Sequence, residues 1–304
     1  MNHRLADHSA RLARARVALE GLSIGDAFGE TFFVLPEMVE ALIESRALRD
    51  QRPWGWTDDT AMALSIVAVL AEHGTIDRDA LATAFADRYR DDPGRGYGGT
   101  AHSILVAIGE GTPWQVAARS AFSGEGSMGN GGAMRVAPVG AYFAEDLDRV
   151  VEEARRSAEP THAHPDGQAG AIAIAVAAAV ATEIGAGRRS PSGRALVDEV
   201  LIRTPTGPTR DALQTMSRFD FDTDVRTVAA RVGCGRGVVS SDTVPLAVWC
   251  AARHLDNFEE ALWTTVSALG DRDTTCAIVG GIVVMATGCD VIPAEWRAAR
   301  EPLP

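Results

Sequence analysis

Cysteine is scarce in this chain: 304 residues contain only four, at Cys234, Cys250, Cys276 and Cys289. No two of them form a CxxC pair, and none has the spacing of a zinc finger. The economical interpretation is that they are buried free thiols in a reduced compartment. We therefore expect a cytoplasmic protein.

Basic residues are also few relative to acidic ones. Lysine and arginine number 29 against 41 aspartate and glutamate, which gives a formal net charge of -12. A general nucleic-acid or anionic-membrane surface would need a basic face, so this balance argues against both. A local basic pocket for one phosphorylated ligand is still compatible with it.

A long continuous apolar run is missing as well. Residues 1–20 alternate arginine, alanine and leucine, which is unlike a signal peptide. Residues 169–181 carry no charge, but they are fewer than the roughly 20 residues that a membrane span needs. We expect this alanine-rich stretch to be a buried central helix, and we expect no membrane partner.

Alternating patterns typical of β-strands do not recur along the chain, and alanine is abundant throughout. We predict an all-α fold in a single domain that spans residues 1–304. Residues 196–201 fit either a helix or a strand, whereas residues 191–193 and 203–208 are expected to be surface loops. Helices are expected over residues 11–23, 57–73, 78–89, 101–108, 113–120 and 147–158.

Two acidic clusters each begin an apolar helix. The first is Thr-Asp-Asp-Thr at residues 57–60, and the second is Gly-Asp-Arg-Asp-Thr-Thr at residues 270–275. Carboxylates and hydroxyls are the hard oxygen donors that Mg²⁺, Mn²⁺ or Ca²⁺ accept. Each cluster alone could simply cap its own helix. Because both precede helices too apolar for the surface, we favour a shared metal site.

Three further segments carry polar groups between the two clusters. Residues 95–100 form a glycine-rich loop ahead of a helix, which is suited to exposing backbone N–H groups to phosphate. Residues 126–135 place an asparagine among glycines and end on an arginine, which suits a ligand loop better than a flexible turn. A Thr-His-Ala-His-Pro segment at residues 161–165 lacks the third ligand that zinc would need. His102 is expected to be a core residue.

Together these motifs resemble the ADP-ribosylglycohydrolase family, which includes the enzyme that reactivates dinitrogenase reductase and the animal ADP-ribosylhydrolases. Five motifs occur in the family's order: Gly-Asp-Ala-Phe-Gly at 25–29, Thr-Asp-Asp-Thr at 57–60, Gly-Asn-Gly through Met-Arg at 129–135, Thr-His at 161–162 and Asp-Arg-Asp-Thr at 271–274. The resemblance extends from about Glu20 to about Gly288, nearly the whole chain.

The resemblance implies a compact orthogonal helical bundle with two Mg²⁺ or Mn²⁺ ions at the base of a cleft. It implies hydrolysis of the bond between C1 of the distal ribose and an acceptor, commonly arginine or serine, with release of ADP-ribose. The implied metal ligands are Thr57, Asp58, Asp59, Asp271, Asp273 and Thr274. The implied ADP-ribose contacts are Gly98, Gly99, Gly126, Ser127, Met128, Gly129, Asn130 and His162.

The implied chemistry uses a water activated by the metals and an oxocarbenium-like state that carboxylates stabilise. Asp58, Asp59 or Asp273 would take the proton of that water; the sequence leaves the choice open. Many family members also carry a glutamate seven residues after the aspartate of the Gly-Asp motif, where this chain has Phe33. Glu30, three residues earlier and on the same side of a helix, is the expected substitute in catalysis.

A second departure is Arg272, because family members usually have threonine between the two aspartates. A guanidinium beside two metals is costly unless it points outward or pairs with a carboxylate or phosphate. The residue before Gly270 is Leu269, where the family usually has another glycine. These differences leave the expected metal ligands intact and the acceptor undetermined.

Two other functions remain open. One is an ADP-ribose-binding pseudo-enzyme without the usual glutamate, and the other is a hydrolase of a different ribosyl or ADP-ribose-derived compound. The retained ligand set favours the enzyme, because a pure binder has little need of two cations. The expected partner is an ADP-ribosylated protein or small molecule, with nucleic acid a partner only if it is the modified acceptor.

Overall fold

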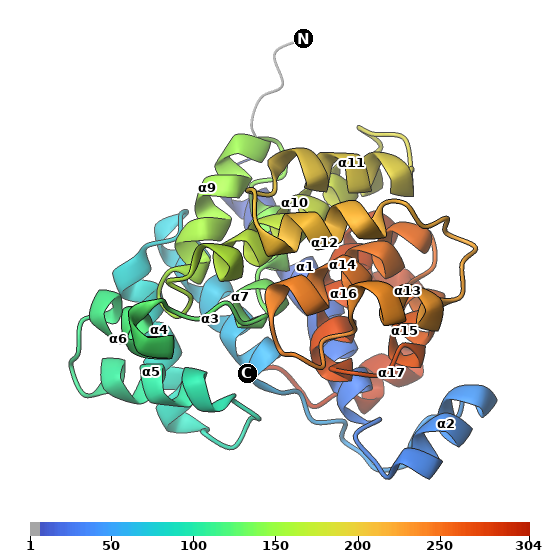
Figure 1. Cartoon of the computed structure of the whole chain (residues 1–304), viewed down its shortest axis with the longest axis horizontal. Coiled ribbons are helices and arrows are strands. Elements are labelled where there is room, and N and C mark those ends of the chain that lie inside the picture. Colours follow the sequence, from blue (N-terminus) through green and yellow to red (C-terminus); the bar gives the residue numbers. More distant parts are fainter. Residues whose placement is uncertain (1–6) are drawn as a thin grey trace.

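The fold is entirely helical over the part of the chain that the structure describes. The structure is a computed structural model, and it describes residues 7–304. That range contains seventeen α-helices and two short 3-10 helices, and it has no β-strand beyond two isolated bridges. The prediction of an all-α fold is therefore confirmed (Figure 1).

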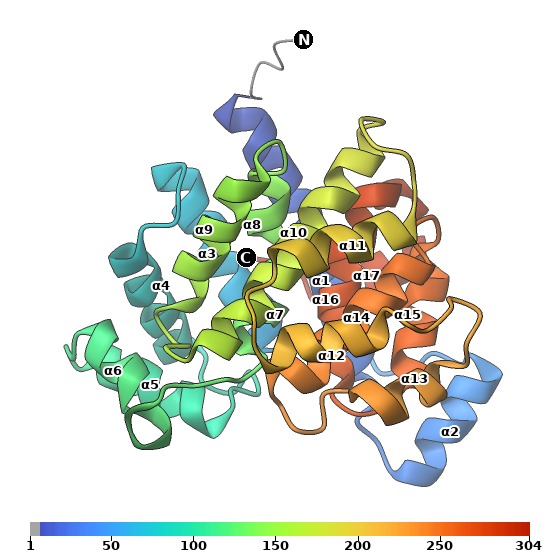
Figure 2. The same cartoon turned by 45° about the horizontal axis from the view of Figure 1, so that its top comes forward.

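Three groups of helices follow one another along the chain (Figures 1 and 2). The first comprises α1 (His8–Glu30), α2 (Pro36–Ser45), α3 (Asp58–His73), α4 (Arg78–Asp91), α5 (Gly99–Gly109) and α6 (Trp114–Ser120). The second comprises η1 (Ala121–Gly124), α7 (Gly131–Met134), α8 (Ala137–Tyr142), α9 (Leu147–Ala158), α10 (Pro165–Gly185) and α11 (Gly193–Arg203). The third comprises α12 (Pro208–Met216), α13 (Val225–Val232), α14 (Ser240–Arg253), α15 (Phe258–Ser267), α16 (Arg272–Thr287), η2 (Cys289–Val291) and α17 (Ala294–Ala299).

Helices α4, α5 and α6 lie on one side of the molecule and α13 and α15 on the other, with α1, α10 and α16 between them (Figures 1 and 2). Helix α1 packs antiparallel along α16 at very close range. A Cβ added to Gly25 would lie 2.1 Å from the carbonyl oxygen of Cys276, and one added to Gly29 would lie 2.2 Å from that of Arg272. Only glycine permits this approach. It brings Asp26 next to the beginning of α16.

Helix α10 is the buried central helix that the sequence predicts. Among the described residues, it is the one helix long and apolar enough to cross a membrane by length and composition. In the folded chain, 83% of its most apolar stretch is buried inside the protein, which is typical of a core helix. It packs against α8, α9, α11 and α16.

Other local predictions had mixed outcomes. Residues 196–201 belong to helix α11, which settles the choice between helix and strand. Helix α1 continues seven residues beyond the expected end at Ser23, because its last turns are buried against α16. The four cysteines are free, and all but Cys289 are buried. His102 was wrongly placed in the core: it is exposed, and its ring bonds to the hydroxyl of Tyr89.

Candidate active site

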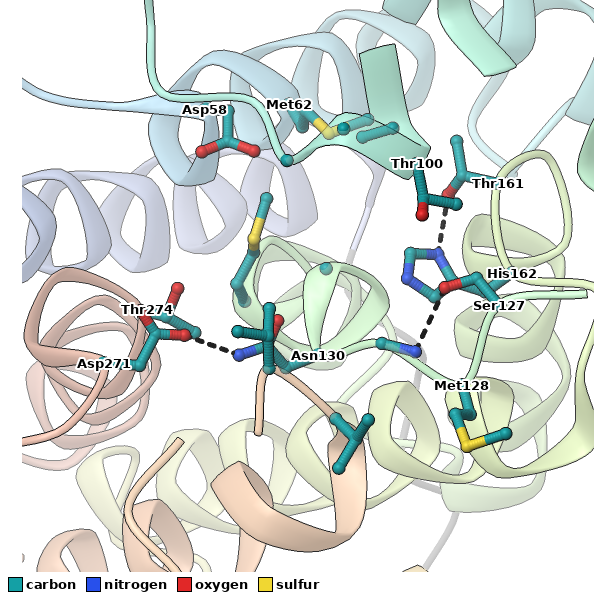
Figure 3. A pocket seen from close by; sticks show the side chains of 18 of the residues that line it. Asp58, Met62, Thr100, Ser127, Met128, Asn130, Thr161, His162, Asp271 and Thr274 are labelled. Atoms are coloured by element: carbon teal, nitrogen blue, oxygen red, sulfur yellow. Dashed lines mark hydrogen bonds between the residues drawn. The ribbon is translucent and has the colours of Figure 1, made fainter. Parts of the chain in front are cut away.

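A cavity of about 600 Å³ lies where the starts of α3, α5 and α16 meet the segments before α7, α10 and α14. This volume is typical of a small-molecule site. Eleven of the residues predicted from sequence line it, and Figure 3 shows several of them. They are Asp58, Gly98, Gly99, Ser127, Met128, Gly129, Asn130, His162, Asp271, Asp273 and Thr274.

Four predicted residues do not line the cavity. Thr57 and Asp59 are buried behind its wall. Gly126 is a turn residue with φ +83°, where an added Cβ would lie 2.7 Å from Ala163, and its contact with ADP-ribose stays a prediction. Glu30 is exposed at the end of α1, outside the cavity.

The two acidic clusters do not cap their own helices. Thr57 and Asp271 occupy the N-cap positions of α3 and α16, yet neither side chain makes a capping hydrogen bond. The hydroxyl of Thr57 lies 2.8 Å from Oδ1 of Asp26 and 3.0 Å from Oδ2 of Asp59. Asn130 Nδ2 donates to Oδ2 of Asp271 over 2.7 Å. The clusters therefore contact residues elsewhere in the site, which argues against the capping interpretation.

Asp26 is a site residue that the sequence analysis did not select. It is fully buried in α1 and accepts hydrogen bonds from the backbone N–H and the hydroxyl of both Thr57 and Thr60, over 2.5 to 3.1 Å. Burial nevertheless raises its pKa to about 7. Asp26 thus fixes the start of α3 against α1. The Gly-Asp pair inside an apolar helix was the sequence signal that could have identified it.

Negative charge at this end of the cavity is poorly compensated. Burial, with the neighbouring carboxylates, raises the pKa of Asp58 to about 8 and that of Asp59 well above its ordinary value. Burial and Asp273 raise the pKa of Asp271 to about 7. Oδ1 of Asp59 and Oδ1 of Asp273 are buried and have no hydrogen-bond partner in residues 7–304. This end of the cavity therefore lacks a group that would satisfy these oxygens.

Arg135 lines the cavity beside Thr161 and is completely buried. Its guanidinium donates to the hydroxyl of Thr161 over 2.7 Å and to the carbonyl of Ser157 over 3.1 Å, and it lies 4.4 Å from the ring centroid of Phe85. No carboxylate forms an ion pair with it among the described residues. Burial lowers its pKa to about 9, so it remains charged at neutral pH.

His162 follows Thr161 and is also buried. Its Nδ1 lies 2.8 Å from the hydroxyl of Thr161. Burial, with the nearby Arg135 cation, lowers its pKa to about 3, so the ring is neutral at physiological pH. His164 is separate from this arrangement, because its Nδ1 accepts the N–H of Asp166 and caps α10.

Two exposed apolar residues line the mouth of the cavity in an unusual backbone conformation. Phe122 and Val238 have φ of 51° and 53°, and their side chains are 57% and 56% exposed. Such left-handed conformations are costly for residues other than glycine and cluster at ligand sites. Val238 is fixed by two bonds: its carbonyl accepts the N–H of Asn130, and its N–H donates to Gly235. No sequence pattern identifies either residue.

The two departures from the family pattern contact each other. The guanidinium of Arg272 lies 4.3 Å from the ring centroid of Phe33, and neither residue lines the cavity. Helix α1 ends at Glu30, so Phe33 lies in the following turn and the expected common helix face does not exist. Burial and Asp273 raise the pKa of Glu30, which places its carboxyl near the acidic end.

The chain belongs to the ADP-ribosylglycohydrolase family. The sequence profile of that family matches residues 7–302, almost the full length. A solved structure described as an ADP-ribosylglycohydrolase-related protein complex has the same fold, with a TM-score of 0.68 over 96% of this chain and 94% of that one. Its sequence is 24% identical, so this similarity concerns the fold alone.

Individual relatives are ADP-ribosylhydrolases. ADP-ribosylhydrolase ARH3 of Xenopus tropicalis is 29% identical over 96% of this chain and 92% of its own length. The human ARH3 is 27% identical over 95% and 90%. The ADP-ribosylarginine hydrolase Tri1 of Serratia proteamaculans is 26% identical over 96% and 76%. Family membership therefore supports a hydrolase that acts on ADP-ribosyl linkages.

Proposed function

We propose that this protein is a metal-dependent hydrolase that cleaves the bond between C1 of the distal ribose and the acceptor of an ADP-ribosylated molecule, releasing ADP-ribose. One observation carries the proposal. Two acidic helix starts meet at one end of a cavity of about 600 Å³, and carboxylate oxygens of Asp59 and Asp273 are buried there without a partner in residues 7–304. Leaving such oxygens unsatisfied is costly, so the arrangement favours a bound cation.

The residues at this end fit hard divalent cations. The six side chains proposed below as ligands present only carboxylate or hydroxyl oxygen, which suits Mg²⁺ or Mn²⁺. No group of three or more His, Cys, Asp or Glu side chains in residues 7–304 has the geometry of a formed metal site, so binding a cation would require these oxygens to lie closer together. The ligands we propose for two cations are Thr57, Asp58, Asp59, Asp271, Asp273 and Thr274. When bound, the cations would polarise ribose hydroxyls and lower the pKa of a water molecule.

The chain's own groups would orient the substrate and handle the proton. The first N–H groups of α5, beginning at Gly99, have no partner within the helix and can bind phosphate oxygen. Asp58 lines the cavity, and burial together with the neighbouring carboxylates raises its pKa to about 8. Its carboxyl is therefore the best placed to take the proton of the attacking water, with Asp59 and Asp273 as alternatives.

A second function has one observation in its favour. Phe33 stands where many members of the family have a glutamate, and its ring is covered by the guanidinium of Arg272 rather than by a carboxylate. Loss of that acid would leave a protein that binds ADP-ribose and turns over slowly or not at all. This alternative predicts the same cavity and a very different rate.

One experiment separates the two functions. The protein is incubated with ADP-ribosylated arginine, serine and nucleobase substrates, each in Mg²⁺, in Mn²⁺ and in EDTA, and free ADP-ribose is measured by chromatography. We expect release with at least one acceptor, and loss of that release in EDTA. Tight binding of ADP-ribose without turnover of any substrate would overturn the hydrolase in favour of the binding protein.

A further inference from the structure

We propose that Arg135 and Thr161 hold His162 in a single neutral tautomer, with its proton on Nε2, so that the ring donates a hydrogen bond to an oxygen atom of the ligand. Arg135 and Thr161 are then positioning residues for the ligand contact. The inference rests on the proposed ADP-ribose cavity for the identity of the ligand. The tautomer itself follows from contacts within the chain.

The direction of each hydrogen bond follows from the chemistry of the donors. A guanidinium has no acceptor, so Arg135 must donate to Thr161 Oγ1 over their 2.7 Å contact. The single hydroxyl proton of Thr161 then has two possible acceptors: Nδ1 of His162 at 2.8 Å and the carbonyl of Ala158 at 3.5 Å. That carbonyl is at the limit of hydrogen bonding and already accepts two backbone N–H groups. The proton therefore goes to Nδ1.

An imidazole whose Nδ1 accepts a hydrogen bond must carry its proton on Nε2. The doubly protonated ring is disfavoured, because His162 is buried close to the charged Arg135. Asp58 and Tyr97 are the other titratable groups near Arg135, and neither forms an ion pair with it among the described residues. The lowered pKa of His162, about 3, agrees with a ring that stays neutral.

The Nε2 side of the ring faces the cavity. Within residues 7–304, Nε2 has no hydrogen-bond partner, and it lies 3.3 Å from the positions that a Cβ on Gly129 or Gly131 would occupy. The oxygen of Ser127 accepts the N–H of Gly129 over 3.1 Å, which leaves the hydroxyl proton of Ser127 free to be donated. Figure 3 shows Ser127 and His162 on the same wall. Two donors at this position select an acceptor oxygen, on a phosphate or a hydroxyl group.

The absence of side chains at residues 129 and 131 is what opens this position to a ligand. A Cβ at Gly131 would lie 3.1 Å from Cε1 of His162, which is tight against the ring. The glycines therefore leave room for a ligand atom beside Nε2. A donor held in place by buried neighbours also loses little conformational freedom on binding.

The tautomer can be measured without any substitution. The protein is labelled with ¹⁵N-histidine, and long-range ¹H–¹⁵N NMR spectra identify which ring nitrogen carries the proton; His162→Gln assigns the signal. We expect a protonated Nε2 and an unprotonated Nδ1 at neutral pH, unchanged at mildly acidic pH. A proton on Nδ1, or an imidazolium at neutral pH, would overturn the proposal.

The positioning role is tested with Thr161→Val and its matched control, Thr161→Ser. Valine removes the hydroxyl at nearly constant volume, so we expect mixed tautomers in the NMR spectrum and about tenfold weaker binding of ADP-ribose by calorimetry. Serine keeps the hydroxyl and is expected to restore both the wild-type tautomer and the affinity.

The results also separate this inference from the proposed function. Equal ADP-ribose affinity in the valine and serine variants, with the predicted tautomer present only in the serine variant, would overturn the role of His162 as ligand donor. If wild-type protein does not bind ADP-ribose at all, the proposed function fails, and the donor role with it. The NMR result for the tautomer would still decide whether Arg135 and Thr161 position the ring.

Discussion

The two ends of the cavity differ in how their buried polar groups are satisfied. At the His162 end, the guanidinium of Arg135, the hydroxyl of Thr161 and the imidazole of His162 form a continuous chain of hydrogen bonds. At the acidic end, Asp59 and Asp273 each bury an oxygen that has no partner in residues 7–304. Figure 3 shows residues from both ends around the same space.

The side chains at the His162 end are therefore held in place by the protein alone, whereas the carboxylates at the acidic end need a bound cation or protons. Hydrogen bonds that are satisfied within the protein fix their side chains in the absence of ligand. Burial, together with repulsion between neighbouring carboxylates, raises the pKa values of Asp26, Asp58 and Asp271, so these carboxyls are costly to ionise unless a cation neutralises them. We therefore expect cations to change the acidic end strongly and the His162 end very little.

The largest effect is expected from Asp273→Asn. A neutral amide cannot neutralise or bridge cations as a carboxylate does, so metal binding and activity should be lost together, with activity falling at least about a hundredfold. Mn²⁺ binding is measured by equilibrium dialysis, and release of ADP-ribose by chromatography. The control is Asp222→Asn on the exposed surface, which should leave both unchanged. Full activity in Asp273→Asn would show that the metal assignment is wrong.

The next largest effect is expected on the pH dependence of the free energy of unfolding, which should differ between the two ends of the cavity. The pKa values of Asp26, Asp58, Asp59 and Asp271 are raised in the folded state, so these four carboxyls bind more protons in the folded protein than in the unfolded chain between about pH 4 and pH 8. In EDTA, their contribution to the free energy of unfolding should therefore fall as pH rises through this window. Mg²⁺ or Mn²⁺ should restore it most at pH 8, where the carboxylates are ionised.

Thermal unfolding in EDTA and in Mn²⁺ at several pH values measures this effect, and we expect shifts of several degrees in Tm. Asp273→Asn provides the matched variant, because it should abolish most of the stabilisation by Mn²⁺. His162 contributes in the opposite direction below about pH 6.5, because its pKa is about 3 in the folded protein, whereas the unfolded chain binds a proton at this residue below its ordinary value of 6.5. The carboxyls are therefore tested above that pH: a Tm that rises from about pH 6.5 to pH 8 in EDTA would contradict their assigned pKa directions.

The acidic end was largely predictable from sequence, because each cluster is contiguous and begins an apolar helix. Asp26 was harder to recognise, since its role depends on how closely α1 packs against α16 and α3. Gly25 and Gly29 permit that packing, but their spacing alone does not reveal the partner helix. Sequence patterns report the face of a helix more readily than the residues that will cover it.

The His162 end was only partly predictable. His162 was selected through its motif, whereas the buried contact between Arg135 and Thr161 joins residues 26 positions apart. Phe122 and Val238 were missed because the left-handed conformation of a non-glycine residue is imposed by its surroundings. Glu30 was assigned a helix face shared with Phe33, and the end of α1 at Glu30 removes that relationship.

A smaller effect is expected from Arg272→Thr, which restores the residue that the family usually has. Arg272 has Arg236 nearby, and neither forms an ion pair in residues 7–304. The two guanidinium groups near the acidic end would repel a positively charged acceptor. We expect the kcat/KM for an ADP-ribosylated arginine substrate to rise several-fold relative to that for a serine substrate. A ratio unchanged from wild type would show that Arg272 does not select the acceptor.

The stability of the same variant serves as its control. Loss of the contact between Arg272 and Phe33 should cost no more than about 1 kcal/mol, because the ring is half exposed. Urea unfolding measures this cost. A much larger loss would mean that Arg272 supports the start of α16, and a change in acceptor preference could then not be attributed to its charge.

The smallest effect is expected from Glu30→Gln. A residue that acts as general acid or base typically contributes about a hundredfold or more to the rate. Glu30 is exposed and lies outside the cavity, although its carboxyl is close enough to Asp273 for its pKa to be raised. We therefore expect a reduction in kcat well below that level, measured at saturating substrate and Mn²⁺. A hundredfold loss with metal binding intact would instead identify Glu30 as the substitute for the glutamate that Phe33 replaces. The acidic end would then include a residue that does not line the cavity.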